Sequence, residues 1–417
     1  MERYDKYKPS GVEWIGEIPE HWEVERTKWL FAESKLRNRE SESFDEDLLS
    51  VSEYYGIAKR IERIDNNDIL NRAESLSEYK IVTQGELVIN IMLAWKKGLG
   101  ISNCNGIVSP SYCVFKLLDE KNDPKFFHYL YRTDLYAEVF RQNSRGIIDS
   151  RLRLYPEEFF NIITIVPPIP EQTAIANFLD DKTAKIDSLV EKKKKLIELL
   201  KEERTAVINQ AVTRGINPNA KLKPSGINWL GDIPEHWQVK KMKYVMNSFD
   251  HVRIPISADL RGGEKIYDYY GASGVIDKVP DYLFDGDHIL IGEDGANLLT
   301  RSTALAFKAT GKFWVNNHAH ILKPKFGNVD FYTYLLESID YTIWVTGSAQ
   351  PKLTAENLLN IKIWFPDREE QNQIVQYIET ETKRIDETIS KIEKEIGLLQ
   401  EYRTALINEM VTGKIKV

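Results

Sequence analysis

The sequence predicts an α+β protein built as a tandem repeat, in which two mixed domains are separated by two long antiparallel coiled-coil helices with pseudo-twofold symmetry. The first observation is a repeated phrase, KPSGVEWIGEIPEHWEV at 8–24 and KPSGINWLGDIPEHWQV at 223–239, with twelve of seventeen positions identical. The second is a pair of similar segments that begin at Pro167 and Pro366 and contain RTAVIN and RTALIN near their ends. The chain therefore predicts two copies of one unit.

Composition limits the class of protein. A chain of 417 residues is too long for one ordinary core, so two or three domains are expected. No apolar run reaches the length of a membrane span, and the start MERYDKYKPS has no apolar signal core, so we expect a cytoplasmic protein without a membrane partner. Cys104 and Cys113 are the only cysteines, which favours a reducing compartment. The net charge of −7 argues against nonspecific coating of nucleic acid but allows local basic surfaces.

The two similar segments predict long helices. No Gly or Pro occurs from Glu171 to Arg214, and only Gly397 interrupts the stretch from Glu370 to Thr412. At 1.5 Å per residue each helix would be roughly 65 Å long. Apolar residues step by three and four along both segments, which is typical of a coiled coil. This seam comprises Ile175, Leu179, Ile186, Val190, Ile197, Leu200, Val207 and Ala211 in the first helix and Ile374, Ile378, Ile385, Ile389, Ile392, Ile396, Leu399, Leu406 and Met410 in the second.

The repeated phrase, called the box here (8–24 and 223–239), is predicted to receive the end of a helix. If a twofold axis relates the copies, the helices pair antiparallel, and the second must end near the first box although no peptide joins them. Gly215 and Gly413 stand where C-terminal caps are expected. The alternative is that the box tryptophans stack on bases, but a frame element that occurs twice is better explained as a dock. These tryptophans are Trp14, Trp22, Trp229 and Trp237.

The middles, 25–166 and 240–365, do not align beyond their ends, and each predicts a compact α+β domain. Both contain stretches without Asp or Glu, at 87–118 and 299–325, where the overall frequency predicts about five and about four. A third stretch, 141–153, has four Arg and one Asp. One interpretation is a selective polyanion-binding surface. The other is that buried strands carry few charges of either sign.

Several side chains in these stretches have base-reading chemistry, because Arg can bond guanine bidentately and Asn or Gln can bond adenine. The segment 314–322, WVNNHAHIL, would alternate as a strand does. GIIDSRL at 146–152 and GSAQPKL at 347–353 occupy equivalent places, which sets Arg151 opposite Lys352. The candidate DNA contacts are Lys96, Lys97, Arg145, Arg151, Arg153, Arg301, Asn316, Asn317, His318, His320, Gln350 and Lys352.

Patterns that suggest catalysis or metal binding have simpler explanations. Asp367 with Glu381 and Lys383 matches a nuclease-like PD…ExK spacing, but it falls on a predicted helix and the first copy lacks it. His318 and His320 could ligate zinc from one strand face, yet both cysteines are far away in the sequence. No GxxxxGK[ST], no glycine-rich turn for a methyl donor and no Asn-Pro-Pro-aromatic motif occurs. The sequence therefore predicts a protein that is not an enzyme.

The chain resembles the specificity subunit of a type I restriction-modification system. The resemblance rests on the double box ending IPEHW, the P-x-x-EQ helix start at Pro168, the RTAVIN and RTALIN helix ends and the two divergent middles, and it covers the whole chain. One departure is Asp367, which replaces the proline of that helix start in the second copy and affects only the loop.

This resemblance implies two target-recognition domains, each reading one half of a bipartite DNA site. Two modification subunits would bring S-adenosylmethionine and methylate adenine, and restriction subunits would add translocation and cleavage with ATP and magnesium. No cofactor or metal is expected in this chain. The implied parts are a first recognition domain (1–166), a first spacer helix (167–215), a second recognition domain (216–365) and a second spacer helix (366–417).

Two other functions remain open at this point. One is a single-chain methyltransferase or nuclease with fused specificity, against which the missing motifs argue. The other is a coiled-coil scaffold that joins two protein-binding domains and has no role on DNA. Salt-sensitive binding to duplex DNA would separate this scaffold from a DNA-recognition protein.

Overall fold

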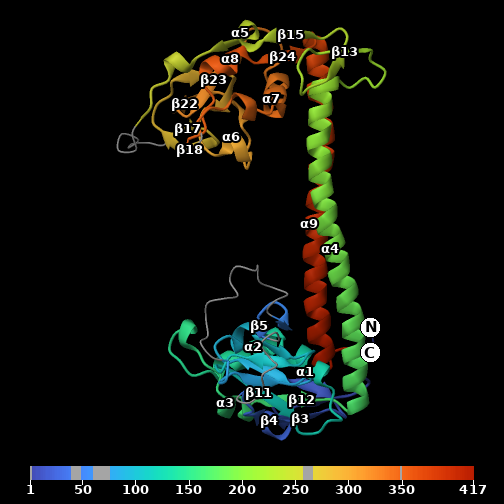
Figure 1. The fold of residues 1–417 in the computed structure, drawn as a ribbon. Coiled ribbons are helices and arrows are strands. Elements are labelled where there is room, and N and C mark those ends of the chain that lie inside the picture. The colour runs from blue at the N-terminus through green and yellow to red at the C-terminus, as the bar shows by residue number, and fades with distance from the viewer. Residues whose placement is uncertain (1, 39–47, 60–75, 257–265, 348–349) are drawn as a thin grey trace. The chain divides into compact units, whose positions relative to one another are not determined.

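The structure is a computed structural model, and it contains mixed helices and strands, as predicted (Figure 1). The residues that it describes are 2–38, 48–59, 76–256, 266–347 and 350–417. The chain forms two compact units, and the division between them runs through both long helices, α4 (Ile169–Arg214) and α9 (Arg368–Val411). Unit 1 comprises Met1–Lys193 and Lys394–Val417, and unit 2 comprises Lys194–Glu393.

Unit 1 is organised around a four-stranded antiparallel sheet in the order β4-β11-β8-β9. A box hairpin, β1–β2, and a strand pair, β3–β12, stand outside this sheet, as do the two-stranded sheets β5–β6 and β7–β10. The strands are β1 (Tyr7–Pro9), β2 (Glu17–Pro19), β3 (Glu23–Arg26), β4 (Phe31–Ser34), β5 (Leu49–Ser52), β6 (Gly56–Lys59), β7 (Lys80–Val82), β8 (Leu87–Asn90), β9 (Leu99–Ile101), β10 (Gly106–Val108), β11 (Tyr112–Leu117) and β12 (Ile163–Val166). The helices are η1 (Thr27–Trp29), η3 (Ala94–Lys96), α1 (Pro124–Tyr131), α2 (Asp134–Gln142), η4 (Asp149–Arg151) and α3 (Pro156–Asn161).

Unit 2 has a four-stranded antiparallel sheet in the order β16-β23-β20-β21 and a second sheet in the order β18-β17-β22-β19. Its box hairpin is β13–β14, and its outer strand pair is β15–β24. The strands are β13 (Leu222–Pro224), β14 (Asp232–Pro234), β15 (Gln238–Lys241), β16 (Met246–Ser248), β17 (Tyr267–Gly271), β18 (Gly274–Val279), β19 (Phe284–Asp285), β20 (His288–Gly292), β21 (Ala306–Ala309), β22 (Lys312–Val315), β23 (Ala319–Pro324) and β24 (Lys362–Phe365). The helices are α5 (Met242–Val245), η5 (Asp250–Val252), α6 (Asn297–Thr300), α7 (Val329–Ser338), η7 (Thr342–Trp344) and α8 (Ala355–Asn360).

The two units share a frame that the sequence alone did not reveal in the middles. In each, a box hairpin precedes an outer strand, and that strand pairs with the last strand before a long helix. In each main sheet, the strand that comes first in the chain pairs with the strand that comes last. The other two strands follow beside the last one, in the order β8-β9 in unit 1 and β20-β21 in unit 2. The units differ in the rest: unit 1 has two small two-stranded sheets where unit 2 has a second four-stranded sheet.

Both long helices are confirmed, with α4 and α9 drawn green and red in Figure 1. All the seam residues are buried or half-buried, as a coiled-coil seam requires. In unit 1, Asp187 and Lys193 of α4 pair with Arg403 and Glu395 of α9, so the residue numbers run in opposite directions and the segments are antiparallel.

The arginine of each RTA motif forms an ion pair with an aspartate of the other helix. Arg403 bonds Asp187 in unit 1 at 2.9 Å, and Arg204 bonds Asp386 in unit 2 at 3.1 Å. Both residues of the second pair lie 199 positions from their counterparts in the first, so the two contacts are one repeated interaction. Exposed pairs of this kind contribute little stability, on the order of 0–1 kcal/mol, but they disfavour shifted registers.

The box receives a helix end, as predicted. In unit 1, Leu406, Met410 and Val411 near the end of α9 join the core that contains Trp22 and Ile18 of the box. In unit 2, Ala211 and Val212 near the end of α4 join the core that contains Trp237. The start of the other long helix also contacts each box.

The buried box tryptophan also binds the first turn of a helix. The Trp22 indole N–H donates to Glu171 of α4 at 2.9 Å, and the Trp237 indole N–H donates to Glu370 of α9 at 3.1 Å. His21 and His236 bond the same carboxylates at 2.5 Å and 2.6 Å. Each box therefore holds the start of one long helix and the end of the other within a single unit.

One expectation about local structure needs correction. The segment 314–322 is not one strand but the end of β22, a turn at residues 316–318 and the start of β23. Among the described residues, no helix is long and apolar enough to cross a membrane.

The docking geometry predicts unequal costs for two equivalent glycine substitutions. Gly215 and Gly413 follow the long helices with φ of 74° and 72°, where an L side chain is strained by about 1–2 kcal/mol. A Cβ on Gly215 would meet its nearest neighbours at 3.4 Å, whereas a Cβ on Gly413 would lie 2.4 Å from Cδ of Pro19. Overpacking of this kind costs about 1–3 kcal/mol more. We therefore expect Gly413→Ala to lower the urea unfolding midpoint clearly more than Gly215→Ala, and equal losses would contradict the tight dock in unit 1.

Candidate nucleic-acid interface

Each unit carries a short loop that is closed by a reciprocal pair of backbone hydrogen bonds. In unit 1, Arg145 and Arg153 exchange N–H···O bonds of 2.9 Å each, and in unit 2, Thr346 and Lys352 exchange bonds of 2.8 Å each. Both loops lead into a six-residue helix, α3 or α8. They are called the first closed loop (145–153) and the second closed loop (346–352), and residues 348 and 349 of the latter lie outside the described residues.

Both closed loops are hydrogen-bonded at their ends to a segment that follows a strand of the main sheet, β8 in unit 1 and β20 in unit 2. The Leu154 N–H donates to the carbonyl of Ile91 after β8, and the Leu353 N–H donates to the carbonyl of Glu293 after β20. By this anchoring, Lys352 corresponds to Arg153. The sequence-based match of Arg151 with Lys352 is therefore wrong, because the first loop has two more residues between its closing pair.

The arginines of the first closed loop differ in their partners. Arg145 is exposed and forms ion pairs with Glu157 and Glu158 of α3. The Arg153 guanidinium donates to the carbonyls of Ser150 and Leu152. Arg151 is exposed, and no carboxylate of the described chain lies within ion-pair distance of it. Arg151 is thus the arginine of this loop that is most available to an external anion.

Lys96 and Lys97 lie on the turn between β8 and β9. Lys96 is exposed and sits over the Trp95 ring at 5.1 Å, whereas Lys97 has a positive φ of 64° and pairs with Asp134 at 2.7 Å. The backbone of this turn is held by Arg132, whose guanidinium donates to the carbonyls of Lys97 and Leu99 at 2.7 Å each. Arg132 also bonds the carbonyls of residues 52–54, and its burial lowers its pKa to about 10.

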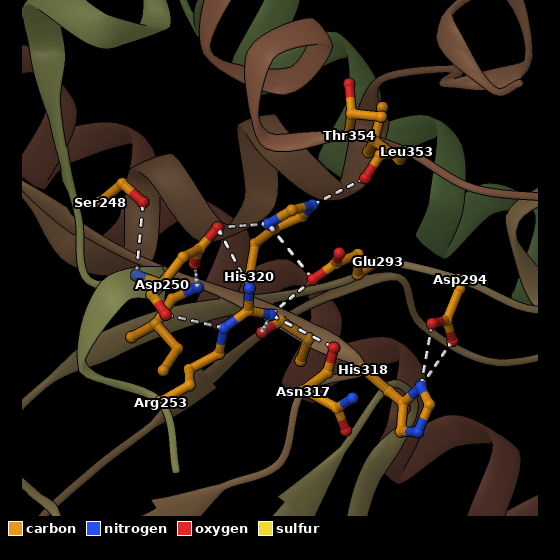
Figure 2. Close-up of polar contacts among 12 residues, drawn as sticks. Ser248, Asp250, Arg253, Glu293, Asp294, Asn317, His318, His320, Leu353 and Thr354 are labelled. Carbon is orange, nitrogen blue, oxygen red and sulfur yellow. Dashed lines mark hydrogen bonds and ion pairs between the residues drawn. The ribbon is translucent and has the colours of Figure 1, made fainter. Parts of the chain in front are cut away.

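In unit 2 a buried histidine lies at the centre of a polar cluster (Figure 2). His320 is fully buried on β23, and its Nδ1 is 2.6 Å from an Asp250 carboxylate oxygen, while its Nε2 is 2.8 Å from the Leu353 carbonyl. Both partners accept hydrogen bonds, so both ring nitrogens are placed to donate. His320 thus has a structural role in the cluster.

Glu293 connects this cluster to the second closed loop. Its carboxylate accepts from Arg253 and lies 3.2 Å from the Lys352 ammonium, and its backbone carbonyl binds Leu353. Arg253 in turn donates to the Ala319 carbonyl at 2.8 Å. The ammonium of Lys352 is therefore held by a buried carboxylate while half of its side chain remains exposed.

The charges of the cluster shift the pKa values of both carboxyl groups. Burial raises the pKa of Asp250, but the hydrogen bond and charge of His320, the Ile321 N–H and Arg253 outweigh it, so the pKa is lowered overall. Burial likewise raises the pKa of Glu293, and Arg253, His320 and Lys352 together lower it below its ordinary value. A lowered folded-state pKa means that this stabilisation is present above the unfolded pKa and is lost as the pH falls through the folded value.

The remaining candidates of unit 2 fall into exposed and engaged groups. Asn317, His318 and Gln350 are exposed, and His318 pairs with Asp294 at 2.9 Å. Asn316 is buried, and its side-chain oxygen accepts from the His318 N–H at 2.8 Å. Arg301 is half-buried, and its guanidinium binds the Ile339 carbonyl and Glu337. No observation on the described chain tests which of these side chains touch DNA, so the contacts stay a prediction.

The residues of the patterns that suggested catalysis form hydrogen bonds with a structural role. The Asp367 carboxylate accepts from the Glu370 N–H at the start of α9, and Glu381 bonds Arg384 along that helix. His318 and His320 point to different carboxylates, Asp294 and Asp250. Within the described part of the chain, no group of three or more His, Cys, Asp or Glu side chains is arranged to hold a metal ion.

Comparisons with known proteins agree on one family. Residues 234–397 match the family model for the type I restriction modification DNA specificity domain. The chain is 25% identical over 440 residues to the type I restriction enzyme MjaVIII specificity subunit of Methanocaldococcus jannaschii, and the match covers 96% of this chain and 94% of that protein. These matches confirm the resemblance to type I restriction-modification specificity subunits that the sequence indicated.

The fold of this chain is also shared with solved structures. A chain from structural work on complex assembly and conformational transition of the type I R-M system superimposes with a TM-score of 0.65 at 16% identity, covering 94% of this chain and 98% of that one. The HsdS subunit from Thermoanaerobacter tengcongensis superimposes with a TM-score of 0.53 at 17% identity, covering 95% of this chain and 98% of that one. At such identities the likeness concerns the fold.

The same matches bear on catalysis. The matched relatives are specificity subunits rather than the modification or restriction subunits of their systems, which confirms the prediction that this chain is not an enzyme.

Sequence reasoning missed three residues of this chain that position the candidate contacts. Asp250 and Arg253 lie on and just after a short 3-10 turn, and Arg132 follows α1; no motif distinguishes them from other charged residues. The available signal was burial, which a single sequence does not report. Glu293 was visible only as part of a glycine-flanked turn.

The cluster predicts a strong contrast between two neighbouring acids. Glu293→Gln removes a charge that compensates Arg253 and His320, and breaking such a buried pair costs about 3–5 kcal/mol. Asp294→Asn removes only an exposed pair with His318, which is worth about 0–1 kcal/mol. Urea unfolding at neutral pH measures both losses. The deficit of Glu293→Gln should shrink as the pH falls below about 4, because the wild-type carboxylate then also loses its charge.

Equal stability losses in the two variants would contradict the buried role of Glu293. A deficit that stayed constant down to low pH would contradict the lowered pKa of this carboxyl group.

Proposed function

We propose that this chain is the sequence-specific DNA recognition subunit of a type I restriction-modification complex, in which each recognition domain reads one half of a bipartite site. It would direct adenine methylation or restriction by its partner subunits. The recognition domains would be residues 1–166 and 216–365, and the spacer helices 167–215 and 366–417. The similarity to type I specificity subunits supports the proposal.

The observation that carries the proposal is a constant frame around different reading surfaces. Both units have the box hairpin, the outer strand pair and the main sheet of one strand order. The closed loops that emerge from this frame have different lengths and residues, Arg-Gly-Ile-Ile-Asp-Ser-Arg-Leu-Arg at 145–153 and a shorter Gly/Pro loop at 346–352. Two identical frames suit two copies of one partner, and two different loops suit two different half-sites.

The reading surface would be polar and cationic. Lys96, Arg151, Asn317, Gln350 and Lys352 are exposed on loops or turns that the main sheet positions. Arginine, lysine and amide side chains bond base edges and phosphates in the major groove. In unit 2 the buried cluster of Asp250, Arg253, Glu293 and His320 would hold the loop in place before DNA arrives, which reduces the entropy lost on binding.

The long helices would set the distance between the two readers. Under pseudo-twofold symmetry the recognition domains would lie at opposite ends of an antiparallel helix pair. They would meet the same groove about one turn apart, roughly 34–36 Å, or a small multiple of this distance. The repeated Arg–Asp pairs across the helices support a fixed register.

The partners would be double-stranded DNA, two modification subunits and restriction subunits. S-adenosylmethionine, ATP and magnesium would belong to those partners rather than to this chain. The work on the structural neighbour that concerns complex assembly of the type I R-M system supports an assembly of this kind.

Exchange of one middle tests the proposal. Residues 240–365 are replaced by the corresponding middle of another specificity subunit, and the complete system is expressed in cells whose methylome is then sequenced. We expect one half-site to change and the other to stay the same, because the frame and the first reader are untouched. Exchange of 25–166 is the matched control and should change the other half-site. A simultaneous change of both half-sites in either chimera would contradict independent reading.

A further inference from the structure

The first closed loop of unit 1 presents two neighbouring apolar side chains to solvent. Ile147 is 99% exposed and Ile148 is 53% exposed. Single exposed isoleucines are common on protein surfaces. Here two neighbouring isoleucines lie at the tip of a loop, one fully and one about half exposed, and their apolar area is in contact with water. Such a tip indicates a surface that is covered when the protein is bound to its partner.

The tip is held in a defined shape. The Arg145–Arg153 hydrogen bonds close its base, and the Arg151 N–H donates to the Ile148 carbonyl at 2.8 Å. Asp149 is fixed by Arg141 of α2 at 3.1 Å. The backbone at Gly146 approaches the Arg151 carbonyl so closely that a Cβ there would lie 2.6 Å from its oxygen. The isoleucines therefore stand on a loop whose backbone is closely packed and hydrogen-bonded at its base.

The charges around this apolar tip are positive on balance. Three carboxylates near the loop are paired with arginines: Asp149 with Arg141, and Glu157 and Glu158 with Arg145. Arg151 is exposed, and Arg153 bonds only backbone carbonyls among the described residues, so four arginines face three carboxylates and a net charge of +1 remains. A polyanion matches an apolar tip that lies beside an exposed arginine in such a surrounding.

We propose that Ile147 and Ile148 form a wedge that inserts between stacked base pairs of the first half-site, while Arg151 contacts the phosphates beside it. The inference rests on the proposed DNA-recognition function. Proteins that kink DNA insert apolar side chains at a base step and hold the deformed backbone with neighbouring cations. The wedge adds readout by deformability, since a pyrimidine–purine step is unstacked more easily than other steps.

The second closed loop has no such wedge. Its sequence between Thr346 and Lys352 is Gly-Ser-Ala-Gln-Pro, which contains no large apolar side chain. The wedge is thus a property of the first reader alone, and the distortion belongs to the first half-site.

The test uses the complete chain assembled with its modification subunits and a duplex that carries its methylation site, with 2-aminopurine placed at successive positions of each half-site. The wild-type complex should raise the fluorescence at one step of the first half-site, because the base there is unstacked. The variant Ile147→Ala/Ile148→Ala should abolish this signal and weaken binding about tenfold, with the salt dependence unchanged. Ile147→Leu/Ile148→Leu should restore both the signal and the affinity.

Two further variants separate the wedge from general surface effects. Arg151→Ala should weaken binding and reduce the slope of log affinity against log salt by about one, because it removes a phosphate contact. Leu118→Ala alters a side chain of the same unit that is 57% exposed and should change nothing. Because Ile147 and Ile148 make no core contact, the thermal unfolding midpoint of the double-alanine variant should equal that of the wild type.

Three results would overturn the wedge. Unchanged affinity and fluorescence in the double-alanine variant would show that the tip does not enter the duplex. Intact DNA binding with failed assembly of the modification subunits would make the tip a protein-docking surface. Absence of salt-sensitive binding to any duplex by the wild-type complex would overturn the proposed function itself, and the wedge with it.

Discussion

The hydrogen-bonded contact between a buried box tryptophan and the ends of the two long helices is the constraint on which each unit depends. Trp22 bonds Glu171 at the start of α4 and packs beside Gly413 after α9, and Trp237 does the same with Glu370 and Gly215. The hydrogen bond goes to a carboxylate in the first turn of one helix, and the packing contact goes to the glycine that follows the other helix. One short phrase thus fixes both a departing and an arriving helix in each unit.

This frame can carry different loops without a change of fold. The box hairpin, the outer strand pair and the strand order of the main sheet occur in both units, and the closed loops join the main sheet through backbone hydrogen bonds at their bases. A loop that is closed by backbone groups can accept a different length or sequence between its closing residues. In unit 2 the loop gains a further anchor, because Glu293 holds Lys352 and is itself fixed by Arg253 and His320.

The long-range order of the chain was predictable, and the polar sites were not. Periodicity predicts the long helices and their seam, to which the buried Ile378 belongs. Repetition predicts the dock, because the buried Trp22 of the first box recurs as Trp237 in the second. The turn at residues 316–318 interrupts a run that alternates well, because backbone pairing with other strands outweighed local pattern. The match between Arg153 and Lys352 became visible only through the hydrogen bonds that anchor the loops. The role of His320 became visible only through its contacts with Asp250 and Leu353, and a sequence reports neither kind of contact. The candidate DNA contacts stay predictions.

The proposed function requires that the helix pair hold the two readers at a set distance. Matched insertions into both helices test this distance most directly. One heptad is added to α4 after Lys193 and one to α9 before Lys394, so that the seam keeps its period in both helices. Seven residues lengthen a helix by about 10.5 Å, which corresponds to roughly three base pairs. The account predicts a methylome in which both half-sites are unchanged and the spacer between them is longer by about three base pairs. An unchanged spacer, or altered half-sites, in cells that still methylate their DNA would contradict it.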